Sequence, residues 1–191
     1  EFLTEPYSHG LAGLANEESF KRDIEKMSDK IEQNFGKRPT VMRNSSLIYT
    51  DEIGAQVAAL GYKGMLTEGA KQVLGWKSPH FVYNCNMAPG LKLLLRDVSA
   101  SDDISLRFSN SSWSGYPLFA DTYINNRASC PESEQVVNIF MELSALGIAQ
   151  PLSSNILEFI KALPVCAKAA GLEFLTPGEV VDKYPSVGAI D

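Results

Sequence analysis

The spacing of apolar residues predicts one long helix near the start of the chain. Five apolar residues recur at steps of four, three, four and four, and they are Phe20, Ile24, Met27, Ile31 and Phe35. This spacing places them along one face of a helix. Asn16 precedes the stretch and can cap the helix, whereas Gly36 and Pro39 follow the stretch and end it. We therefore expect a helix from Asn16 to Phe35.

Short apolar runs bounded by turn residues predict strands along the rest of the chain. The runs are Glu1–Thr4, Thr40–Arg43, Gly64–Thr67, Phe81–Asn84, Leu91–Arg96, Val136–Met141 and Leu172–Leu175. Val136–Met141 has the strongest strand signal, because it is β-branched, aromatic and nearly all apolar. We expect this run and Thr40–Arg43 to be core strands.

Residues that can cap helices predict further helix starts between the strands. The predicted starts are Asp51, Ser101, Asn155 and Thr176-Pro177. The acidic pair Asp102-Asp103 suits the first turn of the second of these helices, where the helix dipole is positive. The third helix is expected to run to Ala170, and Pro164 should kink or split it.

Strands that alternate with helices are typical of an α/β protein with a mainly parallel sheet and helices outside it. The periodicity alone does not separate an open sheet from a barrel. No internal repeat or linker interrupts the pattern, so we expect residues 1–191 to form a single domain.

Composition narrows the choice of partners. The chain of 191 residues is 45% hydrophobic and has a formal net charge of −6, without a run of Lys and Arg, so nucleic acid is not an expected partner. No apolar run reaches the roughly 20 residues that span a bilayer, so no membrane is expected either.

The chain starts with Glu1 rather than Met, which indicates a piece of a longer protein. The sparse cysteines and the lack of a signal peptide favour a cytoplasmic location, and the sequence gives no oligomeric state.

The cysteines and histidines show no pattern of a disulfide framework or a metal site. Cys85, Cys130 and Cys166 are widely separated, and three reduced thiols are the simpler interpretation. His9 and His80 have no cysteine or carboxylate at metal-ligand spacing. We therefore expect no metal and no cofactor.

Polar and aromatic residues follow several predicted strands, where barrel enzymes place catalytic side chains. The segments concerned are Glu1–His9, Arg43–Asp51 and Met141–Gln150. His9, taken alone, is more often a turn residue than a catalyst. Trp113 lies in a polar loop, Ser109–Gly115, and it is equally well interpreted as a sugar-stacking ring or as a hydrophobic plug.

The run Arg43–Asp51 resembles the catalytic segment of α-amylases of glycoside hydrolase family 57. That segment reads Arg-Asn-Thr-Glu-Leu-Ile-Tyr-Asn-Asp, and its Glu is the nucleophile; this chain has Ser46 there. Other runs also resemble the family, and they are Glu1–His9, Leu66–Ala70, Leu74–Trp76, Leu93–Arg96, Ser101–Ile104, Arg107–Ser109 and Phe174–Pro177. The resemblance therefore covers nearly the whole chain. It implies part of an incomplete seven-stranded β/α barrel, similar to a TIM barrel.

The resemblance also assigns the second catalytic position. The family carries its acid/base Asp in a segment that here reads Phe140–Gln150, and Glu142 takes the place of that Asp. Retaining glycosidases need two carboxyl groups about 5–5.5 Å apart. Polar neighbours in the family segment are replaced here, notably by Ile148 and Ala149. The resemblance implies that Glu1, His9, Arg43 and Trp113 contact sugar, and that the partner is an α-glucan or oligosaccharide.

Three interpretations remain open. The first is an α-glucan-binding, amylase-like protein that has lost hydrolysis, with Ser46 and Glu142 in one cleft at the carboxyl ends of their strands and Arg43 nearby. The second is an active retaining hydrolase or glucanotransferase with relocated carboxylates, for which Asp51, Asp102 and Asp103 are candidates, although their helix-capping roles are the simpler explanation. The third is a structural or regulatory module without a ligand. A metal-dependent deacetylase would need an Asp/His/His cluster, and we discount it.

Overall fold

The computed structural model describes residues 1–190, which fall into two compact units. Residues 1–96 and 176–190 make up the first, which we call the sheet unit. Residues 97–175 make up the second, which we call the helical unit. Each unit has its own cluster of buried apolar side chains. The expectation of a single domain over 1–191 stays a prediction.

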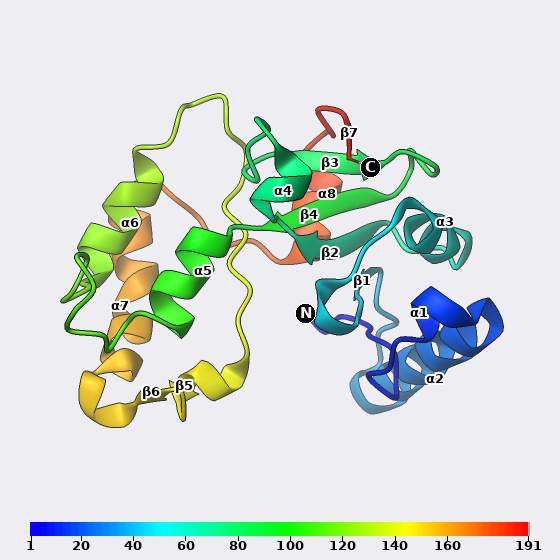
Figure 1. The fold of residues 1–191 in the computed structure, drawn as a ribbon, viewed down its shortest axis with the longest axis horizontal. Helices are drawn as coiled ribbons and strands as arrows, with labels where there is room; N and C mark the ends of the chain where they lie inside the picture. Colours follow the sequence, from blue (N-terminus) through cyan, green and yellow to red (C-terminus); the bar gives the residue numbers. More distant parts are fainter. Residues whose placement is uncertain (191) are drawn as a thin grey trace. The chain divides into compact units, whose positions relative to one another are not determined.

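A five-stranded, mainly parallel sheet forms the centre of the sheet unit (Figure 1). Its strands are β1 (Val41–Arg43), β2 (Gly64–Glu68), β3 (Val82–Cys85), β4 (Lys92–Arg96) and β7 (Ala189–Ile190). The order is β1-β2-β4-β3-β7, and β3 runs antiparallel to β4 whereas the other neighbours are parallel. The prediction of an α/β fold with a mainly parallel sheet is confirmed. Within residues 1–190 the sheet is open and does not close into a barrel.

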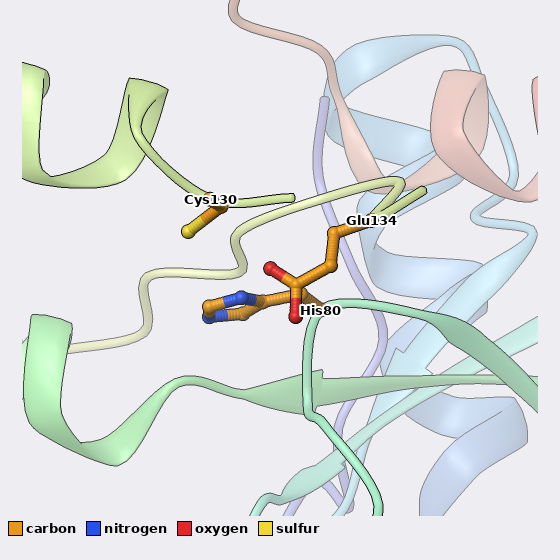
Figure 2. Close-up of side chains that lie close together, drawn as sticks. All are labelled: His80, Cys130 and Glu134. Carbon is orange, nitrogen blue, oxygen red and sulfur yellow. The ribbon is translucent and has the colours of Figure 1, made fainter. Parts of the chain in front are cut away.

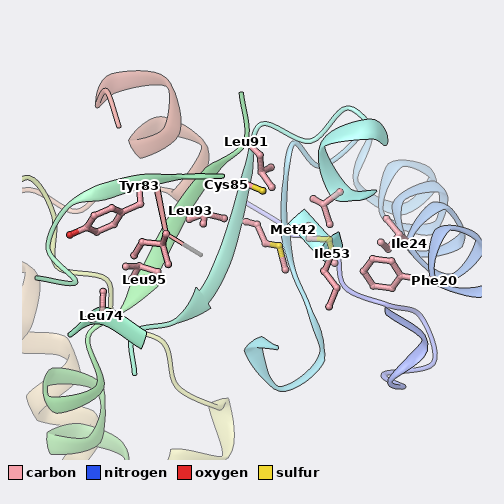
Figure 3. Packing of buried hydrophobic residues seen from close by; sticks show 13 residues of the cluster. Phe20, Ile24, Met42, Ile53, Leu74, Tyr83, Cys85, Leu91, Leu93 and Leu95 are labelled. Atoms are coloured by element: carbon pink, nitrogen blue, oxygen red, sulfur yellow. The ribbon is translucent and has the colours of Figure 1, made fainter. Parts of the chain in front are cut away.

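Six helical segments belong to the sheet unit among its described residues. They are α1 (Ala12–Ala15), α2 (Glu17–Phe35), η1 (Ser45–Leu47), α3 (Asp51–Ala59), α4 (Lys71–Leu74) and α8 (Pro177–Lys183). The long helix α2 matches the prediction. Asn16 Oδ1 accepts a hydrogen bond from Ser19 N at 2.8 Å, and Gly36 ends the helix with φ 73°. Phe20 and Ile24 of α2 join Met42 of β1 in the core (Figure 3).

The helical unit is built from α5 (Val98–Ser105), α6 (Ala120–Ala128) and α7 (Ile156–Ala169), with short elements η2 (Leu143–Ala145), β5 (Leu146–Gly147), β6 (Gln150–Pro151) and η3 (Leu152–Ser154). Its core includes Phe159, whose ring packs edge-on against Phe108 and Tyr123. Helix α7 continues through Pro164 as one element. Among the described helices, none has both the length and the apolar character needed to cross a bilayer.

Two strand predictions in the helical unit are wrong. The structure describes all of Val136–Met141 and shows an extended segment with a β-bridge at Asn138 alone, and Leu172–Leu175 is irregular. Asn138 O accepts from Asp97 N at 2.8 Å, and Phe140 N donates to Ser101 Oγ at 3.1 Å. Asp97, which caps α5, and Ser101 within α5 therefore bond the backbone of this segment, as a neighbouring strand would in a sheet. Glu1–Thr4, in the sheet unit, makes an isolated parallel bridge at Thr4 to Met42 rather than a full strand.

Two predicted caps are displaced. Thr50, not Asp51, caps α3, and its Oγ1 accepts from Ile53 N at 3.3 Å. Asp97, not Ser101, caps α5, which therefore starts earlier than expected, and its carboxylate accepts from Ala100 N at 2.8 Å. All four residues are of types that can cap a helix, so the residue type alone does not decide which of them does so.

Candidate functional site

Charged side chains lie at the carboxyl ends of three parallel strands of the sheet unit. β1 ends at Arg43, β2 at Glu68 and β4 at Arg96, and the last two residues are paired in register. Open α/β sheets bind their ligands outside the carboxyl ends of the strands. We call this side of the sheet the carboxyl edge, and it is the candidate site of the sheet unit.

Ser46 follows β1 at the carboxyl edge, in a turn that its neighbours fix. Asn44 Oδ1 accepts from Ser45 N at 2.8 Å, and Asn44 Nδ2 donates to Ile48 O at 2.9 Å. Ser46 has φ 52° and Leu47 has φ 56°, a left-handed conformation that residues other than glycine rarely adopt. Such strain persists only where the surroundings hold it, and it gathers at functional sites. The turn exposes Ser46 and buries Ser45, whose Oγ has no hydrogen-bond partner among the described residues.

Arg43 and His9, two predicted sugar contacts, lie together at this edge. Arg43 Nη2 is 3.5 Å from His9 Nδ1. Both also contact Glu5, whose Oε2 is 2.9 Å from Arg43 Nη2 and 3.5 Å from His9 Nδ1. The bridge from Thr4 to Met42 aligns the two segments, and Arg43 N donates to Thr4 O at 2.8 Å. The structure thus places a cation, an anion and an imidazole together, all half-buried or exposed, where they can exchange hydrogen bonds with a ligand.

Glu5 and Glu68 are charged residues of the edge that sequence analysis missed. Glu68 Oε1 lies 3.5 Å from Arg96 Nη1 and accepts from Gly69 N at 3.1 Å. Both carboxylates belong to runs that resemble the family, and Glu68 directly follows a predicted strand. That position at a strand end was the signal that could have identified Glu68.

Glu1 is not brought together with Arg43. The bridge at Thr4 runs parallel to β1, so Glu1 points toward the other end of that strand. Its Oε2 accepts from Gly178 N at 2.8 Å, and a Cβ at Gly178 would lie 2.5 Å from the Glu1 carboxylate. The Glu1 side chain therefore holds the start of α8 in this structure.

Glu142, the acid/base position, is exposed and follows the extended segment of the helical unit. Ser144 Oγ donates to Glu142 Oε2 at 3.0 Å. The side chain of Ile148 is also exposed. Ser46 belongs to the sheet unit and Glu142 to the helical unit, so their sharing one cleft stays a prediction.

Trp113 is half-buried and packs against the core of the helical unit. A Cβ at Gly115 would lie 2.6 Å from the indole ring, so the backbone of Gly115 rests against that ring. Of the two roles left open by the sequence, this packing favours the hydrophobic plug over the sugar-stacking ring.

The carboxylates proposed as substitutes for a lost nucleophile already have partners. Asp51 Oδ1 accepts from Tyr49 Oη at 2.8 Å and from Asn86 N at 3.3 Å. Burial raises the pKa of Tyr49 well above its ordinary value, so its hydroxyl remains a donor. Asp103 pairs with Arg107 at 2.5 Å and Arg127 at 3.1 Å, and these contacts fix α5 to α6.

Cys130 and Glu134 lie close together in the segment that follows α6 of the helical unit (Figure 2). Figure 2 also draws His80, which belongs to the sheet unit. Burial raises the pKa of the Cys130 thiol, and its hydrogen bond to the Glu134 carboxylate raises it further. A protonated thiol is a poor metal ligand and a poor nucleophile, and a metal that bound here would first have to displace that proton.

The open, mainly parallel sheet with polar groups at its carboxyl edge defines an α/β chain of the kind that binds ligands at the ends of its strands. The model of glycosyl hydrolase family 57 matches residues 1–191, and the chain belongs to that family. A curated relative, "Putative alpha-amylase" from Methanocaldococcus jannaschii, is 38% identical over 192 residues. The match covers 100% of this chain and 40% of the relative, so the chain spans less than half of that protein's length.

Solved structures of the same fold agree with this assignment. The 4-alpha-glucanotransferase from Thermococcus litoralis superposes with a TM-score of 0.75 over 100% of this chain and 29% of its own, at 12% identity. A GH57-type branching enzyme from Pyrococcus horikoshii gives a TM-score of 0.74 over 99% of this chain and 46% of its own, also at 12% identity. At such identities the likeness supports the fold, and the family assignment rests on the match of the family model.

Proposed function

We propose that the protein containing this chain binds α-glucan at the carboxyl edge of the sheet and hydrolyses it negligibly. The observation that carries the proposal is Ser46, which lies in a strained, exposed turn and which the resemblance aligns with the nucleophile of the family. The names of similar proteins, an alpha-amylase, a 4-alpha-glucanotransferase and a branching enzyme, support α-glucan as the ligand class.

The missing carboxylate is the chemical reason for the loss of hydrolysis. A retaining glycosidase forms a covalent bond between a carboxylate and the sugar before water releases the product. A serine hydroxyl needs a base to act as a nucleophile, and the imidazole of His9 already contacts Glu5 and Arg43. By analogy with knockouts of serine proteases, loss of a covalent nucleophile lowers turnover by roughly 10⁴–10⁶.

Binding, in contrast, keeps its polar groups. Arg43 with Glu5, and Arg96 with Glu68, offer charged donors and acceptors at one edge of the sheet. Charge-assisted hydrogen bonds of this kind are strong and directional, and a few well-placed polar groups suffice to orient a ligand. The edge can therefore hold a sugar although it lacks the group that would attack it.

Two measurements on the full-length protein test the proposal. Calorimetric titration with maltoheptaose should show binding, and reducing-sugar release from amylose should stay at the background of a Glu142→Ala variant. Robust release that Glu142→Ala abolishes would overturn the loss of hydrolysis. Absence of binding together with absence of release would overturn the proposal as a whole and leave a module without a glucan ligand.

A further inference from the structure

The connection between β2 and β3, residues 69–81, starts and ends at the carboxyl edge. β2 leaves the sheet at this edge after Glu68, next to the end of β4 at Arg96. β3 runs antiparallel to β4 and starts with Val82 opposite Leu94, so the chain re-enters the sheet near the same end of β4. Both ends of the connection are thus fixed at the edge that carries Arg43 and Ser46. In Figure 1, α4 of this connection lies next to the arrowhead end of β2.

A tight, anchored turn lies in this connection. Lys77 N donates to Leu74 O at 2.9 Å, and Gly75 between them has φ 59° and ψ −110°. These are the angles of the first central residue of a type II′ turn, a position that glycine dominates. Leu74 is buried in the core, and Lys77 Nζ donates to Ala189 O at 3.0 Å. The turn is therefore held on both of its sides.

Trp76 occupies the second central position of this turn and is 92% exposed. Tryptophan is highly buried on average, and the turn holds this indole in solvent, where its face is accessible to a ligand. Sugar rings present apolar C–H faces that pack on aromatic rings, and a side chain on a rigid turn loses little entropy on binding. Glu68 directly precedes the connection, and with its partner Arg96 at the end of β4 it offers hydrogen-bonding groups that suit sugar hydroxyls.

We propose that Trp76 is a glucan-stacking residue that extends the binding site from the carboxyl edge onto the β2–β3 connection. The inference rests on the proposed function, because it takes an α-glucan as the ligand. Its rival is that Trp76 packs against another part of the longer protein, since the chain spans 40% of the length of its relative. If Trp76 stacks on sugar, removal of the indole changes the sugar affinity. If Trp76 packs against protein, removal of the indole changes the thermal stability.

The experiment compares three variants of the full-length protein by calorimetric titration with maltoheptaose and by thermal melting. Trp76→Ala removes the ring and Trp76→Phe keeps a smaller one. Met87→Ala is the matched control, because Met87 is 59% exposed on the connection from β3 to β4, at the opposite edge of the sheet. We expect Trp76→Ala to raise Kd about tenfold. Trp76→Phe should retain most of the affinity, Met87→Ala should bind as the unmodified protein does, and all three should melt at the same temperature within about 2 °C.

Each other outcome has a distinct meaning. Unchanged binding in Trp76→Ala, with binding by the unmodified protein intact, overturns the stacking role and leaves the proposed function standing. A melting temperature that falls while Kd stays constant identifies Trp76 as a packing residue and also overturns the stacking role. Absence of binding by the unmodified protein overturns the proposed function, and the stacking role with it.

Discussion

The Arg43 guanidinium and the Glu5 carboxylate form an ion pair, with 2.9 Å between Nη2 and Oε2. The two residues are far apart in sequence, and the backbone bridge between Thr4 and Met42 aligns them. Both side chains are about one-third exposed, and such pairs contribute little net stability. Their position at the carboxyl edge therefore points to a role in binding rather than in folding.

Arg43→Lys should weaken glucan binding more than it changes stability. Lysine keeps the positive charge but replaces the planar guanidinium, whose Nη2 contacts both Glu5 and His9, with an ammonium group on a stem of different length and geometry. We expect Kd for maltoheptaose to rise about fivefold, measured by calorimetric titration. Arg38→Lys is the control, because Arg38 pairs with Asp29 and Glu32 on the surface of α2. Equal effects of the two variants would contradict a binding role for Arg43.

The sequence predicted several elements from local signals, although it missed helix α6, and it was wrong where an element depends on distant partners. The apolar stripe of α2 and the runs of β2 and β4 each identify one element without reference to any other, and all three are confirmed. Val136–Met141 has the strongest strand signal, but a strand also needs a neighbour that bonds its backbone along its length. Here only Asn138 makes a β-bridge, and Asp97 N and Ser101 Oγ bond the backbone of Asn138 and Phe140.

In the candidate site, too, the sequence does not predict contacts between residues that are distant along the chain. Family likeness located Ser46 and Arg43 at a strand end. Glu5 acquires its role only from the fold, because its partner Arg43 lies on another segment. Glu1 belongs to the same matching run as Glu5, yet the direction of that segment turns it toward α8. A run of matching residues therefore places a segment but not each of its side chains.

Gly69→Ala should destabilise the sheet unit and disturb the carboxyl edge. A Cβ at Gly69 would lie 2.1 Å from Arg96 O, and because that atom belongs to the backbone of β4, it cannot rotate away. We expect a loss of at least about 2 kcal/mol in the free energy of unfolding, measured with urea. Gly90→Ala is the control, since a Cβ there has open space, and its effect should stay within about 0.5 kcal/mol. A Gly69→Ala variant as stable as Gly90→Ala would contradict the close approach of β2 and β4.

Tyr123→Phe should reduce stability at neutral pH and flatten its alkaline decline. Tyr123 is fully buried, its hydroxyl donates to Ala100 O at 3.0 Å, and losing that bond should cost about 1 kcal/mol. Burial raises the pKa of Tyr123 well above its ordinary value, although the Arg127 guanidinium opposes this. The unfolded tyrosine releases its proton near about pH 10 while the folded one retains it. The stabilising effect is therefore complete below that pH and declines as pH rises above it.

Urea unfolding between neutral pH and about pH 11 measures this decline, since the window opens where unfolded tyrosine titrates. Tyr116→Phe is the control in the same unit, because the Tyr116 ring is exposed. The decline of unfolding free energy with pH should be shallower in Tyr123→Phe than in Tyr116→Phe. Identical slopes in the two variants would contradict the buried, protonated state of Tyr123.

Ser46→Glu combined with Glu142→Asp should restore measurable hydrolysis. By the resemblance, the pair returns the nucleophile and the acid/base group of the family to positions 46 and 142, and it tests whether the carboxyl groups alone are missing. Reducing-sugar release from amylose by the full-length protein is the measurement, and Ser46→Gln with Glu142→Asp is the matched control, since glutamine has the size of glutamate without its nucleophilic oxygen. We expect release from the glutamate pair and none from the glutamine pair. Equal release from both pairs would show that position 46 is not the nucleophile. No release from either, with maltoheptaose binding intact, would show that the segment around Ile148 and Ala149 no longer positions the acid, because a catalytic group works only when its neighbours hold it in place.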